Sequence, residues 1–285
     1  MSIVPKPFFK GYVNCQLLKG VIILVIDFHT HIFPDSVAEK TVNFLGNECG
    51  LKPSFNGTLV GLKQSMAEAG IDKSVIHIVI TKPEQTKRVN EWAASVQDDN
   101  IISFGGLHPL NEDYKEHVNA AVSLGLKGIK FHPDYHNCFV DEPFMLPVYD
   151  YILSKGLIVL FHAGVDIGLP PPVHCPPDRL RKVIDAMKGG VIVAAHLGGF
   201  RMWDKVETYL VGQNLYFDTS MGFEHYSKEQ FLRIVKNHGC ERIVFGTDAP
   251  WSNQKEELIR IKSSGFNENV LENILYNNAK NILMI

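Results

Sequence analysis

Short apolar and β-branched runs alternate along the chain with longer segments in which apolar residues recur at helical spacing. This alternation is typical of βα units, which build a parallel sheet covered by helices. The run at 157–161 is apolar at every position, as expected of a strand buried on both faces. The pattern predicts strands at about residues 21–28, 73–80, 101–107, 126–132, 157–162, 190–196, 214–219 and 242–247.

Helical patterns fall between these strands, and glycines mark several of the expected helix ends. The glycines are Gly70, Gly125, Gly156 and Gly239, at positions where a left-handed cap is favoured. The segment from Leu169 to Pro177 is predicted to be a loop, because its consecutive prolines cannot continue a helix. Helices are predicted at about residues 84–98, 111–124, 143–154, 177–188, 201–211, 227–238, 253–263 and 267–280.

The order of elements predicts an α/β fold, a (β/α)8 TIM barrel formed by residues 21–285. Residues 1–20 have an irregular pattern and are expected to be an N-terminal extension. At 285 residues the chain has an ordinary length for such a barrel, which typically needs about 250. An open, doubly wound sheet is the main alternative, but it would not explain the polar residues described below.

Composition and charge narrow the class of protein. The chain is 45% hydrophobic and 21% charged with a net charge of −3, so nucleic acid is not expected as a partner. The five cysteines are widely spaced without a Cys-x-x-Cys pair, which favours a reducing compartment over a disulfide framework. No apolar run reaches the length of a membrane span, and we expect a cytoplasmic protein without a membrane partner.

Residues that can bind a metal stand where the predicted strands end. The active sites of parallel β/α barrels are built at the C-terminal ends of the strands, which would bring distant residues together. A polar residue ending an apolar strand would be costly to bury without a partner. The residues are His29 with His31, Lys130 with His132, His162, His196 and Asp248.

Imidazoles and a carboxylate form a nitrogen and oxygen donor set that suits zinc, with another divalent transition metal as the alternative. Such an ion lowers the pKa of a bound water and makes it a nucleophile at neutral pH. Asp248 could bind the metal and also take or return a proton. His196 could be a ligand or could lie beside the water as a base.

Five motifs in order resemble the amidohydrolase superfamily, specifically the amidohydrolase-related branch that includes aminocarboxymuconate-semialdehyde decarboxylase and several lactonases. The resemblance runs from about residue 24 to Ala279 and implies a metal-dependent TIM-barrel enzyme. The motifs are Asp27-Phe28-His29-Thr30-His31, Gly128-Ile129-Lys130-Phe131-His132-Pro133, Phe161-His162-Ala163-Gly164, Ala195-His196-Leu197-Gly198-Gly199 and Phe245-Gly246-Thr247-Asp248-Ala249-Pro250.

The resemblance also implies roles for the strand-end residues. It implies that His29, His31, His162 and Asp248 bind the metal, that Asp248 doubles as acid and base, and that His196 lies near the metal-bound water. The role of Lys130 is left open by the resemblance. As a carboxylated lysine it would bridge two metals, with His196 on the second ion, and in a one-metal site it would instead face an anionic substrate. We favour one metal, and a homodimer is compatible with the resemblance.

Other side chains are expected around the pocket. We expect His132, His174, His108 and Trp203, with Lys130, to contact a small-molecule substrate. Asp218 is expected to form a hydrogen-bonding wall, and His77 to lie in the core. His117, His136, His225 and His238 are expected at the surface.

Hydrolysis of an amide, lactone or related carbonyl by a metal-activated water is the leading functional hypothesis. The resemblance allows non-oxidative decarboxylation of a small unsaturated or aromatic carboxylate as the alternative. Phosphoester hydrolysis would gain support from a second metal. A barrel without catalysis, acting as a binding protein, is the most distant hypothesis.

Overall fold

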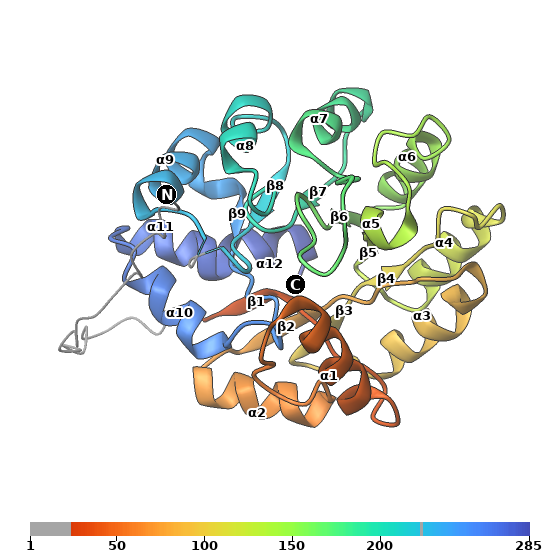
Figure 1. Ribbon diagram of the computed structural model, residues 1–285, viewed down its shortest axis with the longest axis horizontal. Coiled ribbons are helices and arrows are strands. Elements are labelled where there is room, and N and C mark those ends of the chain that lie inside the picture. Colours follow the sequence, from red (N-terminus) through yellow and green to blue (C-terminus); the bar gives the residue numbers. More distant parts are fainter. Residues whose placement is uncertain (1–23, 223–224) are drawn as a thin grey trace.

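The computed structural model describes residues 24–222 and 225–285, so the predicted extension at 1–20 lies outside the described residues. Every strand pairing within the described part is parallel, and helices surround the strands (Figure 1). The strands are β1 (Ile26–Thr30), β2 (Lys73–Ile76), β3 (Ile101–Ser103), β4 (Gly105–Gly106), β5 (Gly128–Phe131), β6 (Ile158–Phe161), β7 (Ile192–Ala194), β8 (Tyr216–Asp218) and β9 (Ile243–Val244).

The strands form a three-stranded sheet, β1 to β3, and a six-stranded sheet, β4 to β9. Phe104 alone separates β3 from β4, and its backbone N–H donates to the Ile76 carbonyl of β2 at 2.9 Å. The two segments therefore occupy one strand position of the predicted pattern. The predicted parallel α/β fold is confirmed, with each predicted strand found at its expected place.

Backbone hydrogen bonds also join the first strand to the segment that follows the last. The Phe28 N–H donates to the Phe245 carbonyl at 2.7 Å, and the Asp248 N–H donates to the His29 carbonyl at 2.7 Å. Thr30 and Ala249 form an isolated parallel bridge at the same place. We call this junction between β1 and residues 245–249 the seam.

The buried carboxylate of Asp27 strengthens the seam. One oxygen accepts from the Thr247 N–H at 3.0 Å, and the other accepts from the Thr247 hydroxyl at 2.6 Å and the Gln254 amide at 2.7 Å. Burial raises the pKa of Asp27 to about 7, although these hydrogen bonds oppose the rise. Asp27 therefore ties the first strand to the segment that follows the last strand and to the helix that begins at Gln254.

Helices are found at all the predicted places, and a short helix that was not predicted follows β5. Between β1 and β2, no helix was predicted and two are found. These are α1 (Ala38–Cys49) and α2 (Leu59–Ala69), and the Thr58 side chain caps α2 by accepting from the Gly61 N–H. The others are α3 (Thr86–Ser95) after the 3₁₀ turn η1 (Pro83–Gln85), α4 (Tyr114–Ser123), α5 (Pro133–His136), α6 (Leu146–Ser154), α7 (Pro177–Ala186), α8 (Trp203–Tyr209), α9 (Lys228–His238), η2 (Cys240–Arg242), α10 (Gln254–Lys262), α11 (Glu268–Glu272), the π-helical η3 (Asn273–Asn277) and α12 (Asn278–Leu283).

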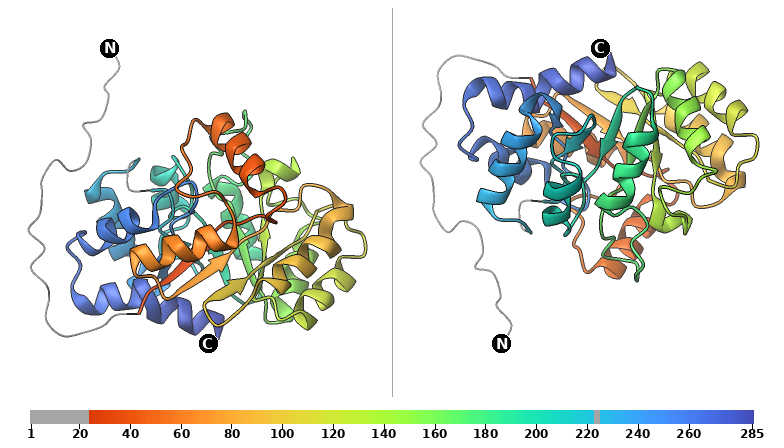
Figure 2. Two further views of the ribbon diagram at one scale, coloured as in Figure 1. Left: turned by 90° about the horizontal axis from the view of Figure 1, so that it is seen from below. Right: turned by 90° about the horizontal axis from the view of Figure 1, so that it is seen from above.

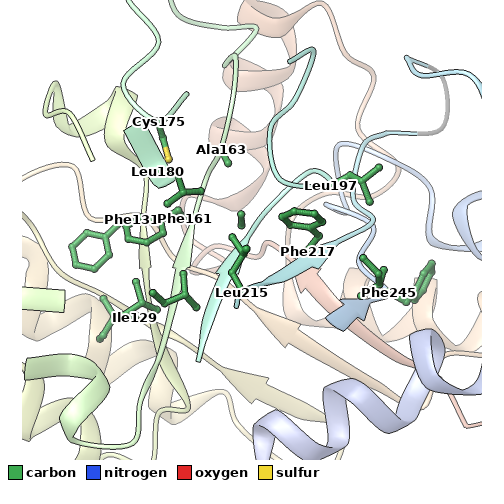
Figure 3. Close-up of a cluster of buried hydrophobic side chains, with 14 of the residues drawn as sticks. Ile129, Phe131, Phe161, Ala163, Cys175, Leu180, Leu197, Leu215, Phe217 and Phe245 are labelled. Atoms are coloured by element: carbon green, nitrogen blue, oxygen red, sulfur yellow. The ribbon is translucent and has the colours of Figure 1, made fainter. Parts of the chain in front are cut away.

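Apolar side chains form two clusters, one between the strands and the surrounding helices and one among the side chains that the strands direct toward one another. The larger cluster lies between strands and helices, and Figure 3 shows Phe131, Phe161 and Phe217 within it. A smaller cluster gathers strand residues such as Phe28 and Phe104 with residues of α12. Figure 2 shows α12 and α1 at opposite ends of the molecule, so α12 covers the end away from the loop that follows β1.

His238 corrects one expectation from the sequence. It was expected at the surface, but it is 1% exposed and its ring stacks on Phe217 with the centroids 4.0 Å apart. The ring accepts from the Gly212 N–H at 3.1 Å and donates to the Leu215 carbonyl at 2.9 Å. Both ring nitrogens are therefore used in the neutral form.

The four described cysteines are free thiols: Cys49, Cys138, Cys175 and Cys240. Cys15 lies outside the described residues. No helix in the part of the chain that the structure describes is long and apolar enough to cross a membrane.

Candidate metal centre

His29, His31 and Asp248 meet where the two strands of the seam end. The Nε2 atoms of the two histidines lie 3.2 Å apart, and the Asp248 carboxylate lies 3.0 Å from His31 Nε2 and 3.4 Å from His29 Nε2. Two ligands that share one ion at about 2.1 Å cannot be more than roughly 4 Å apart. The three side chains meet this condition.

Hydrogen bonds behind the two imidazoles fix which nitrogen faces the centre. His29 Nδ1 lies 2.8 Å from Asp218 Oδ2, and His31 Nδ1 lies 2.8 Å from the His77 carbonyl oxygen. Since a carboxylate and a carbonyl can only accept, both rings carry their proton on Nδ1. Each Nε2 is left with a lone pair, which is the form that binds a metal.

The backbone around the centre departs from ordinary strand geometry. Asp248 has φ of 67° and His196 has φ of 59°, in the left-handed region that non-glycine residues rarely adopt. At Gly246 a Cβ atom would come within 2.9 Å of His29 Cβ and 3.3 Å of Asp218 Cβ. Glycine is therefore required there for the strands to approach closely.

Lys130 places a cation beside the three side chains. Its side chain is 2% exposed, and its Nζ donates to His29 Nε2 at 3.4 Å. Burial lowers the pKa of Lys130 to about 8, while the Asp248 and Asp218 carboxylates oppose the fall. Burial also lowers the pKa of His29 well below its ordinary value, with the Lys130 charge adding to the effect.

His162 does not join His29, His31 and Asp248. Its Nδ1 lies 3.0 Å from His196 Nε2, and its own Nε2 is buried without a hydrogen-bond partner among the described residues. The structure groups His162 instead with His132 and Asp166, with ligand atoms within 4.8 Å of one another. Three of the four expected ligands therefore converge. His162 is separated from them by the ring of His196.

The group formed by His132, His162 and Asp166 has the wrong shape for an ion of its own. The two rings stack with centroids 4.1 Å apart and planes inclined by 12°. A ring nitrogen donates its lone pair in the ring plane, so one ion cannot lie in two stacked, nearly parallel planes. The His132 Nε2 instead lies 3.1 Å from the Asp166 carboxylate as a hydrogen-bond donor.

The first group fits a divalent cation. Two neutral imidazoles with lone pairs aimed inward and one carboxylate form the mixed donor set expected of such a site. The buried, unpartnered Nε2 of His162 is the kind of atom that a fourth ligand would offer. It would need a movement of the ring to reach the same ion.

The structure places the other expected pocket residues in supporting contacts. The His174 backbone N–H and ring both donate to Asp134 at 3.0 Å, which holds the loop after β6 against α5. His108 Nδ1 accepts from the Leu110 N–H at 3.2 Å and so stabilises a turn. The Trp203 indole donates to the His196 carbonyl at 3.1 Å and packs behind that residue.

Ser220 and the carbonyl of His77 are parts of the site that the sequence did not reveal. Ser220 Oγ lies 2.9 Å from His196 Nδ1 and 3.2 Å from His29 Nδ1. Ser220 follows Asp218, the acidic end of an apolar strand, by two residues. That spacing was the available signal, since it puts a hydroxyl at the same strand end. The hydrogen-bonding part expected of Asp218 agrees with its contacts.

A sequence model of the amidohydrolase family matches residues 26–285. No curated protein matches the chain. Among solved structures, an uncharacterised TIM-barrel protein from Bordetella bronchiseptica is 18% identical, with a TM-score of 0.72 over 91% of this chain and 98% of that chain.

Two further similar structures are decarboxylases by name. 5-Carboxyvanillate decarboxylase from Sphingomonas paucimobilis is 14% identical, with a TM-score of 0.67 over 93% of this chain and 100% of that chain. A dihydroxybenzoic acid decarboxylase from Polaromonas, with bound manganese and the inhibitor 2-nitroresorcinol, is 14% identical, with a TM-score of 0.67 over 92% of this chain and 97% of that chain. At these identities the likeness establishes the fold.

Proposed function

The chain belongs to the amidohydrolase family, and on that premise we propose that it is a metal-dependent decarboxylase of a small aromatic carboxylate. The proposal takes up the alternative that the sequence left open beside hydrolysis. It is favoured by the reactions named for the similar structures, 5-carboxyvanillate and dihydroxybenzoate decarboxylation. A divalent cation is part of the proposal, with zinc and manganese as the candidates.

One observation in the structure carries the proposal: a buried ammonium group stands beside the candidate metal ligands. Lys130 Nζ lies 3.4 Å from His29 Nε2 and is shielded from water. A buried cation is costly unless an anion accompanies it. The Asp248 and Asp218 carboxylates supply part of that negative charge, and a substrate carboxylate would add to it once Asp248 binds a cation, whereas a neutral amide or lactone would not.

The proposed roles follow from these positions. His29, His31 and Asp248 would hold the cation, with His162 as the expected fourth ligand. When bound, the cation supplies positive charge that holds substrate oxygen atoms and offsets negative charge on the ring. Lys130 would hold the substrate carboxylate through a charge-assisted hydrogen bond.

Decarboxylation needs a proton as well as a bound anion. The bond between the ring and the carboxylate breaks, its electron pair stays on the ring carbon, and CO2 leaves. A proton must then replace CO2 on that carbon. We propose that Asp248, the closer to the histidine ligands, is the acid that gives this proton to the ring carbon, and that His196 is the base that takes up the next proton from solvent and returns it to Asp248.

The test is a product assay on protein loaded with zinc or with manganese. Hydroxylated benzoates, lactones and N-acyl compounds are supplied in parallel, and CO2 release is measured beside substrate loss. We expect CO2 from at least one hydroxybenzoate in equal amount to the substrate consumed, abolished by a chelator. Ring opening or amide cleavage without CO2 would overturn the proposal in favour of hydrolysis.

A further inference from the structure

The carboxylate of Asp218 contacts both a candidate metal ligand and the candidate base. Its Oδ2 lies 2.8 Å from His29 Nδ1, and its Oδ1 accepts from the His196 backbone N–H at 2.9 Å. Oδ1 also accepts from the Ser220 hydroxyl at 2.5 Å and from the Ser220 N–H at 3.1 Å. All of these groups are almost fully buried.

The Ser220 hydroxyl has one proton, and its contacts decide where that proton points. Because Asp218 can only accept, the hydroxyl proton is directed to Oδ1. The hydroxyl oxygen is then an acceptor for His196 Nδ1, which lies 2.9 Å away. His196 therefore carries its proton on Nδ1.

The same reasoning extends one ring further. With its proton on Nδ1, His196 has a lone pair on Nε2, which accepts from His162 Nδ1 at 3.0 Å. His162 then has a lone pair on its own buried Nε2. A single carboxylate thus sets the orientation of protons along Ser220, His196 and His162, and separately on His29.

We propose that Asp218 and Ser220 are positioning residues that keep His29 and His196 in the Nδ1-protonated form, so that neither Nε2 carries a proton. The inference rests on the proposed function, because it assigns the form in which His196 acts as base. The two residues differ in their main partners: Asp218 contacts His29 Nδ1 at 2.8 Å, whereas Ser220 Oγ lies nearer to His196 Nδ1, at 2.9 Å, than to His29 Nδ1, at 3.2 Å.

This difference predicts different behaviour for substitutions at the two positions. Ser220→Ala removes the nearer acceptor for His196 Nδ1 and leaves only the Ser220 backbone carbonyl at 3.4 Å, while Asp218 still orients His29. We expect kcat for decarboxylation to fall about 10- to 100-fold, with KM and metal content within twofold of the wild type. Asp218→Asn also replaces the carboxylate that accepts the Nδ1 proton of the candidate ligand His29. We therefore expect the metal to bind this variant about 10- to 100-fold more weakly than the wild type.

Two further variants separate positioning from packing. Ser220→Thr keeps the hydroxyl and is expected to restore most of kcat. Thr219→Val removes the neighbouring buried hydroxyl, which donates to the Gly246 carbonyl at 3.0 Å and contacts no imidazole in the structure. It is the matched control and is expected to leave the histidines unchanged.

The decisive readout is independent of turnover. Nitrogen-15 spectra of histidine in the zinc-loaded protein distinguish a protonated from an unprotonated ring nitrogen, and His196→Gln assigns the signals. We expect His196 protonated on Nδ1 in the wild type and Thr219→Val, and a mixture of the two forms in Ser220→Ala. An Nε2-protonated His196 in the wild type, or an unchanged pattern in Ser220→Ala, would overturn the inference.

The two proposals can fail separately. If the wild type shows the expected nitrogen signals but releases no CO2 from any substrate, the decarboxylase assignment fails and the positioning stands. If CO2 is released but metal affinity in Asp218→Asn equals that of the wild type, the positioning role of Asp218 fails and the reaction stands.

Discussion

Lys130 is the residue whose part differs most between the two arrangements considered for this site. As a carboxylated lysine it would bridge two metals, and as an ammonium it would bind the substrate anion. Burial lowers the pKa of Lys130 to about 8, although the nearby Asp248 and Asp218 charges oppose the fall, and its Nζ donates to the His29 Nε2 lone pair. The contacts therefore favour the ammonium, which is the form expected of Lys130 in a one-metal site.

Replacing Lys130 with methionine keeps its length and removes its charge. We expect KM for the aromatic carboxylate to rise roughly 10- to 100-fold, since a hydrogen bond to a charged group contributes about 1.5–3 kcal/mol. Metal content, measured by atomic emission, should stay at one equivalent per chain. Lys127→Met, just before the start of β5, is the control. Loss of one of two metal equivalents in Lys130→Met would instead indicate a bridging carboxylated lysine.

At the scale of elements, two histidine–aspartate pairs fasten the loop after β6 to the start of α5. His132 of the β5 end contacts Asp166 of the loop at 3.1 Å, and His174 of the loop contacts Asp134 of α5 at 3.0 Å. In the first pair the loop provides the aspartate, and in the second pair it provides the histidine. The proline-rich loop is therefore held at two points rather than free to cover the site.

Asp134→Ala should release the second of these points. The His174 ring and backbone N–H both lose their acceptor, at about 1 kcal/mol for each hydrogen bond. We expect amide hydrogen exchange in residues 164–176 to accelerate about tenfold or more, as measured by mass spectrometry. Asp150→Ala, at an exposed position of α6, should not change that exchange. Unchanged exchange in both variants would contradict the fastening role.

The convergence of the strand-end residues was predictable, because the C-terminal ends of parallel strands lie together at one end of the fold and this does not depend on side-chain packing. His29, His31 and Asp248 converge for that reason. The ring orientation was not predictable, since His29 depends on Asp218, which lies 189 residues away in sequence. The displacement of His162 toward His196 likewise depends on contacts between neighbouring strands, which no local pattern encodes.

The elements show the same limit. The alternation of strand and helix predicted the order of the fold, but α1 and α2 were missed because apolar side chains such as Phe44 and Val60 are exposed there and blur the helical pattern. His238 was misplaced because a residue ending a polar helix resembles a surface residue. Its burial follows from the packing of α9 beside β8, which brings Phe217 under its ring.

At the scale of the whole molecule, His238 should make stability depend on pH. Burial lowers its pKa from 6.5 to about 4, and in the neutral form Nδ1 accepts from the Gly212 N–H. The unfolded chain therefore binds a proton more readily than the folded one between these values. The contribution is fully present above pH 6.5 and is lost as the pH falls toward 4.

His238→Gln should remove this part of the pH dependence. A lowering of the pKa from 6.5 to about 4 corresponds to roughly 3 kcal/mol, the most that the free energy of unfolding could change through this group. Urea unfolding at pH 7.5 and at pH 5 should show a smaller difference for the variant than for the wild type. His117→Gln, at a half-buried position, is the control. Equal differences for all three proteins would contradict the assignment.

The seam has a consequence for the order in which this protein is assembled. His29 lies in the first strand, His31 directly after it and Asp248 in the segment after the last strand, and the long-range partners of Asp27 are Thr247 and Gln254. During synthesis the N-terminal half of the chain emerges first. The seam and the complete set of candidate ligands can therefore form only after residues near the C-terminus have been made. An ion bound by all three side chains would stabilise the complete folded protein, because ligand binding favours the state that binds it. It would not stabilise a nascent chain that still lacks Asp248.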